Sequence, residues 1–455
     1  MKNSVCLKCG FAKEDITPQI PVVMDGFAAR EGKSRGIRDP LLLRVIAIKD
    51  SEGMNCLFVI MDLIGLNDSL ATGIKNRIQD KFAFPLERII LISTHTHSGP
   101  AAGVLSGLEI SEPYISMVFD KLSKAVENAL GNLEDMTLDV VTGDVHIGVN
   151  RRCFLNGRIQ IGENFDAPRD DTLRVLRFTR GDNLAGVWLN ASCHPVNLDA
   201  RNTLISADYP GVLYQKLAQM HPEVFSAFTN SSAGNMNPII LEGESQEEAL
   251  NRNGAELVRA FDAIVDRPVP NAVEKGRIKV LKAEVDVPVY IERDAETLRK
   301  KLEFYREKLR NSKTDTERYV ATTYADWYQA RLDEIEEPVG DCLKTSIQLC
   351  CLDEKIWVLA LPFEVFVETK AKILKQAAAL GVAPEQILLC SCANAVKAYL
   401  PTPEAIAEGG YEVESSYIWY GLPGRYTAQS EPSVVQACLK LIGNSMSKVG
   451  WGNGK

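Results

Sequence analysis

Three of the five histidines in the chain lie in two short motifs: His95 and His97 in ISTHTHSGP, and His194 in SCHPV. The first pair follows the apolar run RIILIST, and a strand that continued through it would place both imidazoles on one face at the carboxyl end. Ligands collect at that end in α/β sheets, and neutral imidazole binds zinc well. The alternative is a set of hydrogen-bonded structural histidines. We therefore predict a metal or catalytic site at these motifs.

Alternating short strands and helices precede and follow these histidines. Apolar runs predict strands at residues 41–50, 55–66 and 87–94, and a helical pattern covers residues 69–82. This alternation predicts a mixed α/β (α+β) fold in which sheets are flanked by helices.

Residues 290–337 differ from the rest of the chain. They are rich in Glu, Lys and Arg, with Leu and Tyr at intervals of three and four, and the pattern breaks near Asn311 to Asp315. This predicts a solvated helical hairpin inserted into one catalytic unit of residues 1–455. A lid or a contact in a homo-oligomer is the alternative role for the hairpin.

The composition of the chain limits the classes of binding partner that we expect. Hydrophobic residues make up 45% and charged residues 24% of 455 residues, as in ordinary globular proteins, and the net charge is −9 with no extended basic face. We therefore expect no nucleic-acid partner. The first residues lack a signal-peptide pattern and no apolar run reaches about 18 residues, so we expect a cytoplasmic protein without stable membrane association.

Eight motifs, in the same order, resemble the catalytic domain of neutral/alkaline non-lysosomal ceramidases. THTHSGP is the most specific, and the others support it mainly by their order. They are GFAKEDITP, GIRDPLLLRVIAI, ISTHTHSGP, VNRR, CHPV, DYPG, SAGNMNP and ALPFEVF. The resemblance spans nearly the whole chain and implies the fold of that domain.

The resemblance also implies a set of site residues. One zinc ion per chain would be held by His95, His194, Glu364 in LPFE and Tyr399 in AYLPTPEA. Glu364 taken alone would be interpreted as a helix-start carboxylate. Histidine, carboxylate and phenolate ligands would also accept another divalent transition metal.

Further family positions imply catalytic roles beside the metal. His97 corresponds to a non-ligand histidine, and Tyr411, in a YE dipeptide 12 residues after Tyr399, corresponds to a second active-site tyrosine. Arg151 corresponds to an arginine that contacts substrate or developing negative charge, although the adjacent Arg152 is an alternative.

One motif departs from the family. Where ceramidases carry a serine in a GDxSP segment, this chain has Asn237, which cannot act as an acyl-accepting nucleophile. Either a metal-activated water attacks directly while Asn237 donates a hydrogen bond, or Ser231 or Ser232 supplies a hydroxyl. We favour the first interpretation.

A second departure is the early end of the chain, which leads us to expect that the usual C-terminal β-sandwich domain is absent. The resemblance implies a zinc-dependent hydrolase acting on an amide or related carbonyl bond. The expected absence of this domain, the missing serine and the missing signal peptide lead us to expect a soluble small molecule as substrate, and not a true ceramidase. A metal-dependent isomerase or lyase acting on a polyol or sugar, and a non-catalytic binding homologue, are the alternatives.

Overall fold

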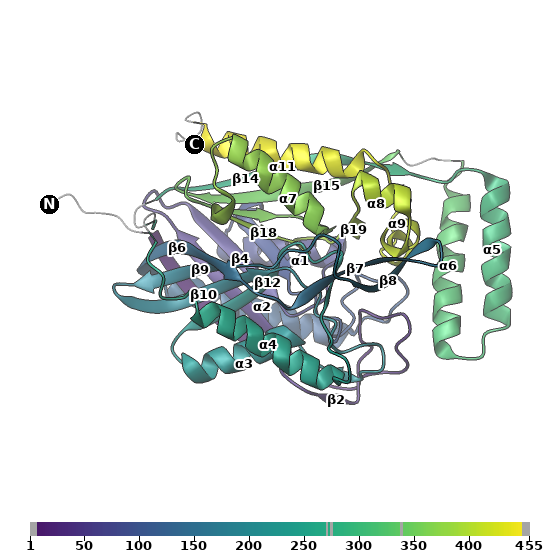
Figure 1. The fold of residues 1–455 in the computed structure, drawn as a ribbon, viewed down its shortest axis with the longest axis horizontal. Coiled ribbons are helices and arrows are strands. Elements are labelled where there is room, and N and C mark those ends of the chain that lie inside the picture. The colour runs from purple at the N-terminus through teal and green to yellow at the C-terminus, as the bar shows by residue number, and fades with distance from the viewer. Residues whose placement is uncertain (1–6, 270–271, 274–275, 337–339, 448–455) are drawn as a thin grey trace.

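A computed structural model describes residues 7–269, 272–273, 276–336 and 340–447 of the chain. Two facing β-sheets form its centre (Figure 1). The larger sheet has eight strands in the order β12 (Phe225–Asn230), β10 (Asn183–Ala191), β9 (Thr172–Arg180), β6 (Glu134–Asp144), β1 (Leu7–Asp15), β3 (Leu42–Lys49), β4 (Asn55–Met61) and β5 (Ile89–Ser93). The second has five: β18 (Ile387–Cys390), β16 (Ile356–Ala360), β15 (Cys342–Leu352), β14 (Ile278–Tyr290) and β20 (Arg425–Tyr426).

Three smaller sheets surround the candidate site. Strands β13 (Met236–Pro238), β7 (Gly148–Leu155) and β8 (Arg158–Asn164) form one of them, and two-stranded pairs are made by β11 (Leu204–Ile205) with β2 (Gly36–Ile37) and by β17 (Glu364–Val365) with β19 (Tyr399–Leu400). Most pairings in the described residues are antiparallel. The parallel ones are β2 with β11, β4 with β5, β10 with β12, β16 with β18 and β17 with β19.

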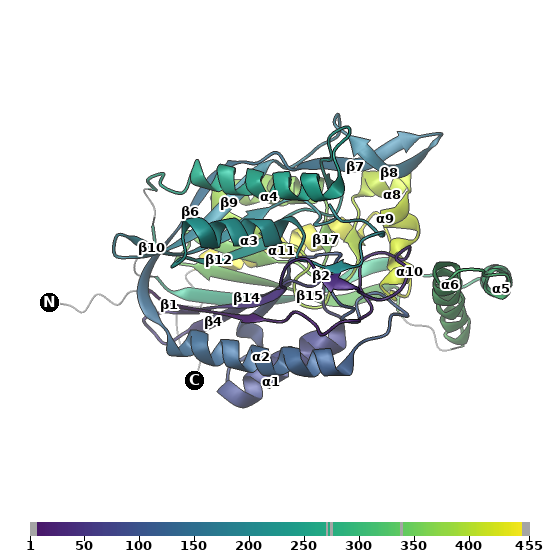
Figure 2. The same ribbon diagram turned by 90° about the horizontal axis from the view of Figure 1, so that it is seen from below.

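Helices cover the outer faces of both large sheets. On the eight-stranded sheet lie α1 (Asp68–Phe82), α2 (Glu112–Gly131), α3 (Tyr209–Met220) and α4 (Gln246–Asp262), as Figure 2 shows. On the five-stranded sheet lie α7 (Val367–Ala379) and α11 (Ser430–Met446). Short helices α8 (Pro403–Glu408), α9 (Tyr411–Glu414) and α10 (Ser416–Trp419) lie near the site. The predicted mixed α/β fold with flanking helices is confirmed.

The alternation of side chains along the strands explains this layering. In β4, Leu57 and Val59 pack against α1 and α2, whereas Phe58 and Ile60 point the other way, into the core between the sheets. Both faces of the strand are therefore apolar, as expected for a sheet covered on both sides.

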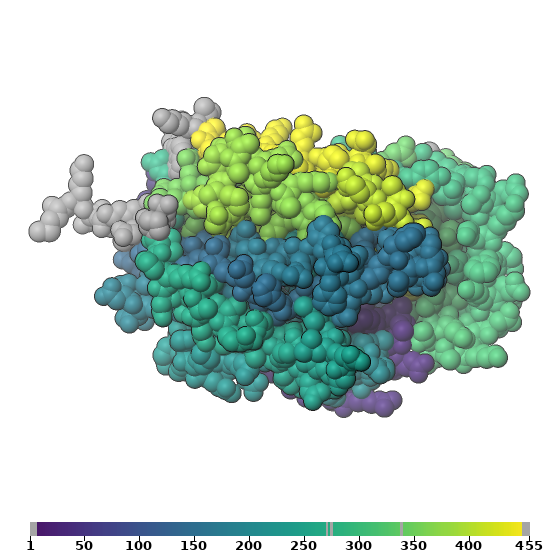
Figure 3. Space-filling model, viewed as in Figure 1, coloured from purple at the N-terminus to yellow at the C-terminus, as the bar shows by residue number. Residues whose placement is uncertain are grey.

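The charged segment forms two antiparallel helices, α5 (Ala295–Arg310) and α6 (Asp315–Asp333), at one end of the molecule (Figures 1 and 3). Thr314 caps the second helix in a capping box with Glu317, which explains why the helical pattern breaks there. Residue 337, the last of the predicted hairpin, lies outside the described residues. None of the helices in the described part of the chain combines the length and apolar character needed to cross a bilayer.

Candidate metal centre

The candidate site lies where strands of both large sheets end. His95 follows β5, His194 follows β10, and Glu364 lies four residues after β16. Because these strands run parallel to a neighbour, their carboxyl ends gather the three side chains, as ligands gather in open α/β sheets. Residues separated by more than 260 positions in the sequence thus meet at one point.

The strand that precedes the first histidines is shorter than we predicted. β5 ends at Ser93, and His95 has a left-handed backbone with φ of 69°, so a strand continuing through His95 and His97 is wrong. The amide of His95 instead donates to the carbonyl of Leu63 at 2.9 Å, which ties the motif to the loop after β4. The two imidazoles still meet, with 3.3 Å between their Nε2 atoms.

Each of the three imidazoles is oriented by a backbone carbonyl. The Nδ1 atom of His95 lies 2.6 Å from the oxygen of Ile64, that of His97 lies 3.0 Å from the oxygen of Gly26, and that of His194 lies 3.1 Å from the oxygen of Met236. A carbonyl can only accept, so each Nδ1 carries the proton. The three Nε2 atoms are left to face one another.

Glu364 completes the cluster. Its Oε2 lies 3.1 Å from Nε2 of His95 and 2.9 Å from Nε2 of His194, and the residue is only 1% exposed. Glu364 belongs to strand β17 and precedes α7, so its interpretation as a helix-start carboxylate is wrong. In the register of the β17–β19 pair it stands opposite Tyr399, and the ring of Tyr399 stacks at 6.2 Å on that of His194.

Burial and charge set the protonation of these groups. Burial and the nearby Arg151 lower the pKa of His194 to about 4, and burial with the two other imidazoles lowers the pKa of His97 well below its usual value. Although burial raises the pKa of Glu364, His95 and His194 outweigh it and hold that pKa well below its usual range. The arrangement therefore presents the neutral imidazoles of His97 and His194 and an ionised carboxylate.

These donors fit a metal ion. An unprotonated Nε2 and a carboxylate oxygen repel each other at 2.9 Å unless a positive charge lies between them. Burial opposes charge on His95, but Cys392 and Glu364 outweigh it and raise the pKa of His95 well above its usual value. His95, His97 and His194 have the spacing of a metal-binding group, and two imidazoles with a carboxylate suit zinc.

Arg151 approaches the same centre from β7. Its guanidinium lies 5.0 Å from the centre of the Tyr399 ring, and its Nε donates to Glu412 at 2.8 Å. Nη2 of Arg151 is buried with no hydrogen-bond partner among the described residues, so it remains available to a ligand. Arg152, the alternative, is directed to Glu412, Glu408 and the carbonyl of Gly409.

Asn237 and the two serines have different surroundings. Asn237 is partly exposed, and its Oδ1 lies 3.4 Å from Nη1 of Arg151. Ser232 is buried in a polar network, 3.1 Å from the hydroxyl of Ser192 and 3.3 Å from Asp170. The hydroxyl of Ser231 is buried without a hydrogen-bond partner in the described part of the chain. Of the three, only Asn237 contacts another predicted site residue.

Two tyrosines stand beside Tyr399. The ring of Tyr411 lies 5.7 Å from that of Tyr399, where the sequence places a second active-site tyrosine. Tyr420, which we did not predict, donates a hydrogen bond from its hydroxyl to Oε1 of Glu364. Nothing in the sequence distinguishes Tyr420 among 13 tyrosines. Glu412, which binds both Arg151 and Arg152, was also missed, although it belongs to the YE dipeptide that pointed to Tyr411.

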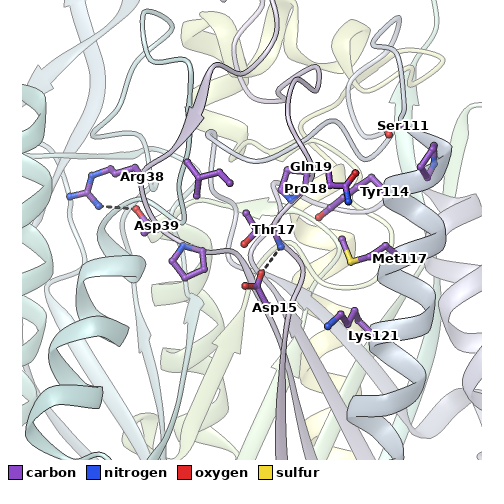
Figure 4. A pocket seen from close by; sticks show the side chains of 13 residues that line it. Asp15, Thr17, Pro18, Gln19, Arg38, Asp39, Ser111, Tyr114, Met117 and Lys121 are labelled. Carbon is purple, nitrogen blue, oxygen red and sulfur yellow. Dashed lines mark hydrogen bonds and ion pairs between the residues drawn. The ribbon is translucent and has the colours of Figure 1, made fainter.

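A separate cavity of about 670 Å³ lies between α2 and the loop after β1 (Figure 4). Its charged groups have partners, since Arg38 pairs with Asp39 and Lys121 with Glu14. None of the residues that line it belongs to the histidine cluster, so we assign it no part in the site.

Comparisons with known proteins point to one family. The family described as neutral/alkaline non-lysosomal ceramidase, N-terminal, matches residues 7–255. A neutral ceramidase from Pseudomonas aeruginosa is 25% identical over 245 residues, which cover 50% of this chain and 36% of that protein. The aligned segment thus spans about a third of that relative's length.

Two solved structures share the fold. The crystal structure of neutral ceramidase from Pseudomonas aeruginosa superposes with a TM-score of 0.75 at 19% identity, covering 97% of this chain and 75% of that one. A ceramidase complexed with C2 gives a TM-score of 0.73 at 18% identity with the same coverage. At this identity the likeness establishes the fold alone.

Proposed function

Because the chain belongs to the neutral/alkaline non-lysosomal ceramidase family, we propose that it is a zinc-dependent hydrolase that cleaves an amide or related carbonyl bond of a soluble small molecule other than ceramide. The observation that carries the proposal is the convergence of His95, His194 and Glu364 on one buried point beside Tyr399. Four ligands of these types would hold the ion, and a bound zinc would polarise a carbonyl and lower the pKa of water.

The neighbouring side chains have the chemistry that such a reaction needs. The free Nη2 of Arg151 would donate to the negative charge that develops on the carbonyl oxygen. His97, whose imidazole is neutral at pH 7, would accept or return a proton at Nε2. Burial, followed by the charge of Glu364, raises the pKa of Tyr411 well above its usual value, so its phenol would keep its proton and donate a hydrogen bond.

The proposed reaction differs from ceramide hydrolysis by an active-site serine, because this chain has Asn237 at the position of that serine. Because its Oδ1 faces Arg151, its Nδ2 is left to donate to substrate. We propose that Asn237 binds the reacting carbonyl and that water is the attacking group. We also propose that residues 1–455 form one catalytic unit, because the site draws on residues from His95 to Tyr411.

The first test is elemental analysis of purified, untagged protein, followed by a screen of acylated amines, lactams and lactones with N-acylsphingosine as the comparator. About one zinc per chain and release of an amine or acid from a soluble substrate would support the proposal. Turnover of N-acylsphingosine alone would contradict its substrate class. Products of the same mass as the substrate would indicate an isomerase.

Replacing His97 with alanine should leave zinc at about one ion per chain while lowering turnover by roughly 100-fold or more, the usual contribution of a general acid or base. His97 lies close enough to His95 to be a ligand itself, so the two properties must be measured on the same sample. Loss of zinc from this variant would make His97 a ligand.

Replacing Asn237 with alanine should lower the catalytic constant by roughly 100-fold without loss of zinc, as expected when one donor to a developing oxyanion is removed. The comparison is Ser231→Ala, which should stay close to wild type. If Ser231→Ala is inactive and Asn237→Ala is not, the serine supplies the attacking group and our proposal for Asn237 is wrong.

A further inference from the structure

We propose that Tyr420 is a positioning residue of the metal centre, and that the α5–α6 hairpin holds the segment that carries it. The inference rests on the proposed function and extends it to residues outside the ligand set. It gives the charged hairpin a role at the metal centre.

The first step is the contact between Tyr420 and Glu364. The Tyr420 hydroxyl donates to Oε1, while Oε2 faces His95 and His194. A carboxylate can rotate about its terminal torsion, and a hydrogen bond to one oxygen fixes which oxygen is presented to a metal. Tyr420 therefore directs Oε2 to the ion and favours ligation by that single oxygen.

The second step is how the backbone around Tyr420 is fixed. The indole of Trp419 lies between two tyrosines of α6, with ring centres 5.7 Å from Tyr319 and 5.4 Å from Tyr324. On the other side, Nε1 of Trp327, also in α6, donates to the carbonyl of Leu422 at 2.8 Å. Helix α6 thus holds the residue before Tyr420 and the residue two positions after it.

The third step connects α6 to the loop that follows the histidine pair. The hydroxyl of Tyr319 donates to the carbonyl of Ser106 at 2.8 Å, and the amide of Ser106 donates to the carbonyl of Trp419 at 2.7 Å. The loop that contains Ser106 and the segment that contains Trp419 are therefore bonded to each other, and Tyr319 of α6 contacts both of them. Figure 1 shows α6 between α5 and the body of the protein, on the side of α9.

Helix α5 packs against α6 on the side that faces away from the body of the protein (Figure 1). The ring of Tyr305 stacks at 4.6 Å on that of Tyr324 and at 5.7 Å on that of Tyr328. The hairpin is thus aromatic between its two helices, while most of α5 is exposed.

The test measures zinc affinity of the metal-free full-length protein by competition with a chromophoric chelator. Tyr420→Phe keeps the ring and removes only the hydroxyl, so zinc should bind about 10 to 100 times more weakly, the usual effect of losing an outer-shell partner. Tyr417→Phe, three residues earlier on the same segment, is the control and should bind within about twofold of wild type, because the Tyr417 ring packs on Trp327, outside the ligand set.

Two further measurements separate positioning from general destabilisation. The melting temperature of metal-free Tyr420→Phe should fall by only a few degrees, since one hydrogen bond to a buried carboxylate is lost, while the visible spectrum of its cobalt(II) form should change. Trp327→Phe, which removes the bond to Leu422, should weaken zinc binding roughly fivefold, as expected for one neutral hydrogen bond.

Equal zinc affinity and identical cobalt spectra in wild type and Tyr420→Phe would overturn the role of Tyr420. Wild-type affinity in Trp327→Phe would overturn the role of the hairpin. Wild-type protein that binds no zinc at all would instead contradict the proposed function from which this inference starts.

Discussion

Replacing Glu364 with glutamine is expected to reduce the zinc content from about one ion per chain to nearly none and to abolish hydrolysis. Glu364 supplies the only carboxylate whose contact with the imidazoles of His95 and His194 is seen in the described residues. Glutamine has nearly the same shape but no charge, and its amide would hydrogen-bond an Nε2 lone pair directly. In the variant, a hydrogen bond from the glutamine amide should therefore take the place of the metal at that Nε2 atom.

The expected loss of zinc affinity in Glu364→Gln is large because the carboxylate would bind the ion directly. Because Glu364 is a proposed ligand, zinc binding should weaken by more than the roughly 100-fold that loss of an outer-shell partner costs. Elemental analysis and chelator competition on the same preparation measure it. Glu368→Gln is the matched control, since this carboxylate, four residues later, accepts from Asn235 and contacts none of the proposed ligands. Full zinc occupancy in Glu364→Gln would remove Glu364 from the ligand set.

Replacing Asp170 with asparagine is expected to lower the free energy of unfolding by about 3–5 kcal/mol, the usual cost of leaving one buried ion without its partner. Asp170 accepts a hydrogen bond at 2.5 Å from the ammonium of Lys370, whose side chain is 3% exposed. It also accepts from Ser192 and Ser232. Asparagine would leave the ammonium buried and uncompensated.

This hydrogen-bond network also contacts the segments that carry the candidate metal centre. Ser192 lies two residues before His194, and Ser232 precedes Ala233, whose carbonyl orients the His194 ring. The variant should therefore also bind zinc more weakly. Asp171→Asn is the control, because its partners Arg169 and His146 are exposed and such surface pairs contribute at most about 1 kcal/mol. A melting temperature equal to wild type in Asp170→Asn would contradict the prediction.

The effect of Asp170 should depend on pH in a defined direction. Burial raises its pKa, but the charge and hydrogen bond of Lys370, together with Ser192, hold that pKa well below its usual value. Burial lowers the pKa of Lys370 to about 8, so both groups are charged at neutral pH. A carboxylate with a depressed folded-state pKa stabilises above its unfolded value of about 3.9 and loses this as the pH falls. The difference between wild type and variant should thus be largest between about pH 4 and pH 8. It should shrink below about pH 4, where the carboxylate takes up a proton, and above about pH 8, where the ammonium of Lys370 loses one.

The sequence by itself determined the secondary structure that carries the site. Apolar runs and helical periodicity predicted β3, β4, β5 and α1, because both faces of a covered strand and one face of a helix must be apolar. The break in the hairpin near Asn311 was predicted because the helical pattern fails there. The concentration of three of the five histidines in two short motifs was enough to identify His95, His97 and His194 as candidate site residues.

The family resemblance added residues that no local pattern could identify. Glu364 and Tyr399 are 35 positions apart in the sequence and become neighbours only through the parallel pairing of β17 with β19. Strands of two residues leave no periodicity to detect. Their proximity to His194 is therefore a product of the tertiary structure, and so is the choice of Arg151 over Arg152 at the centre.

The tertiary structure alone decided the contacts that orient the three histidines of the candidate site. The left-handed turn at His95 is held by the loop after β4, and the carbonyls that fix the three imidazoles come from Gly26, Ile64 and Met236. The same holds for Tyr420, whose hydroxyl reaches a carboxylate 56 residues earlier in the chain. Residue types and spacing limit which atoms can bind a metal, but the direction of each lone pair depends on backbone groups distant in sequence, and only folding brings those together.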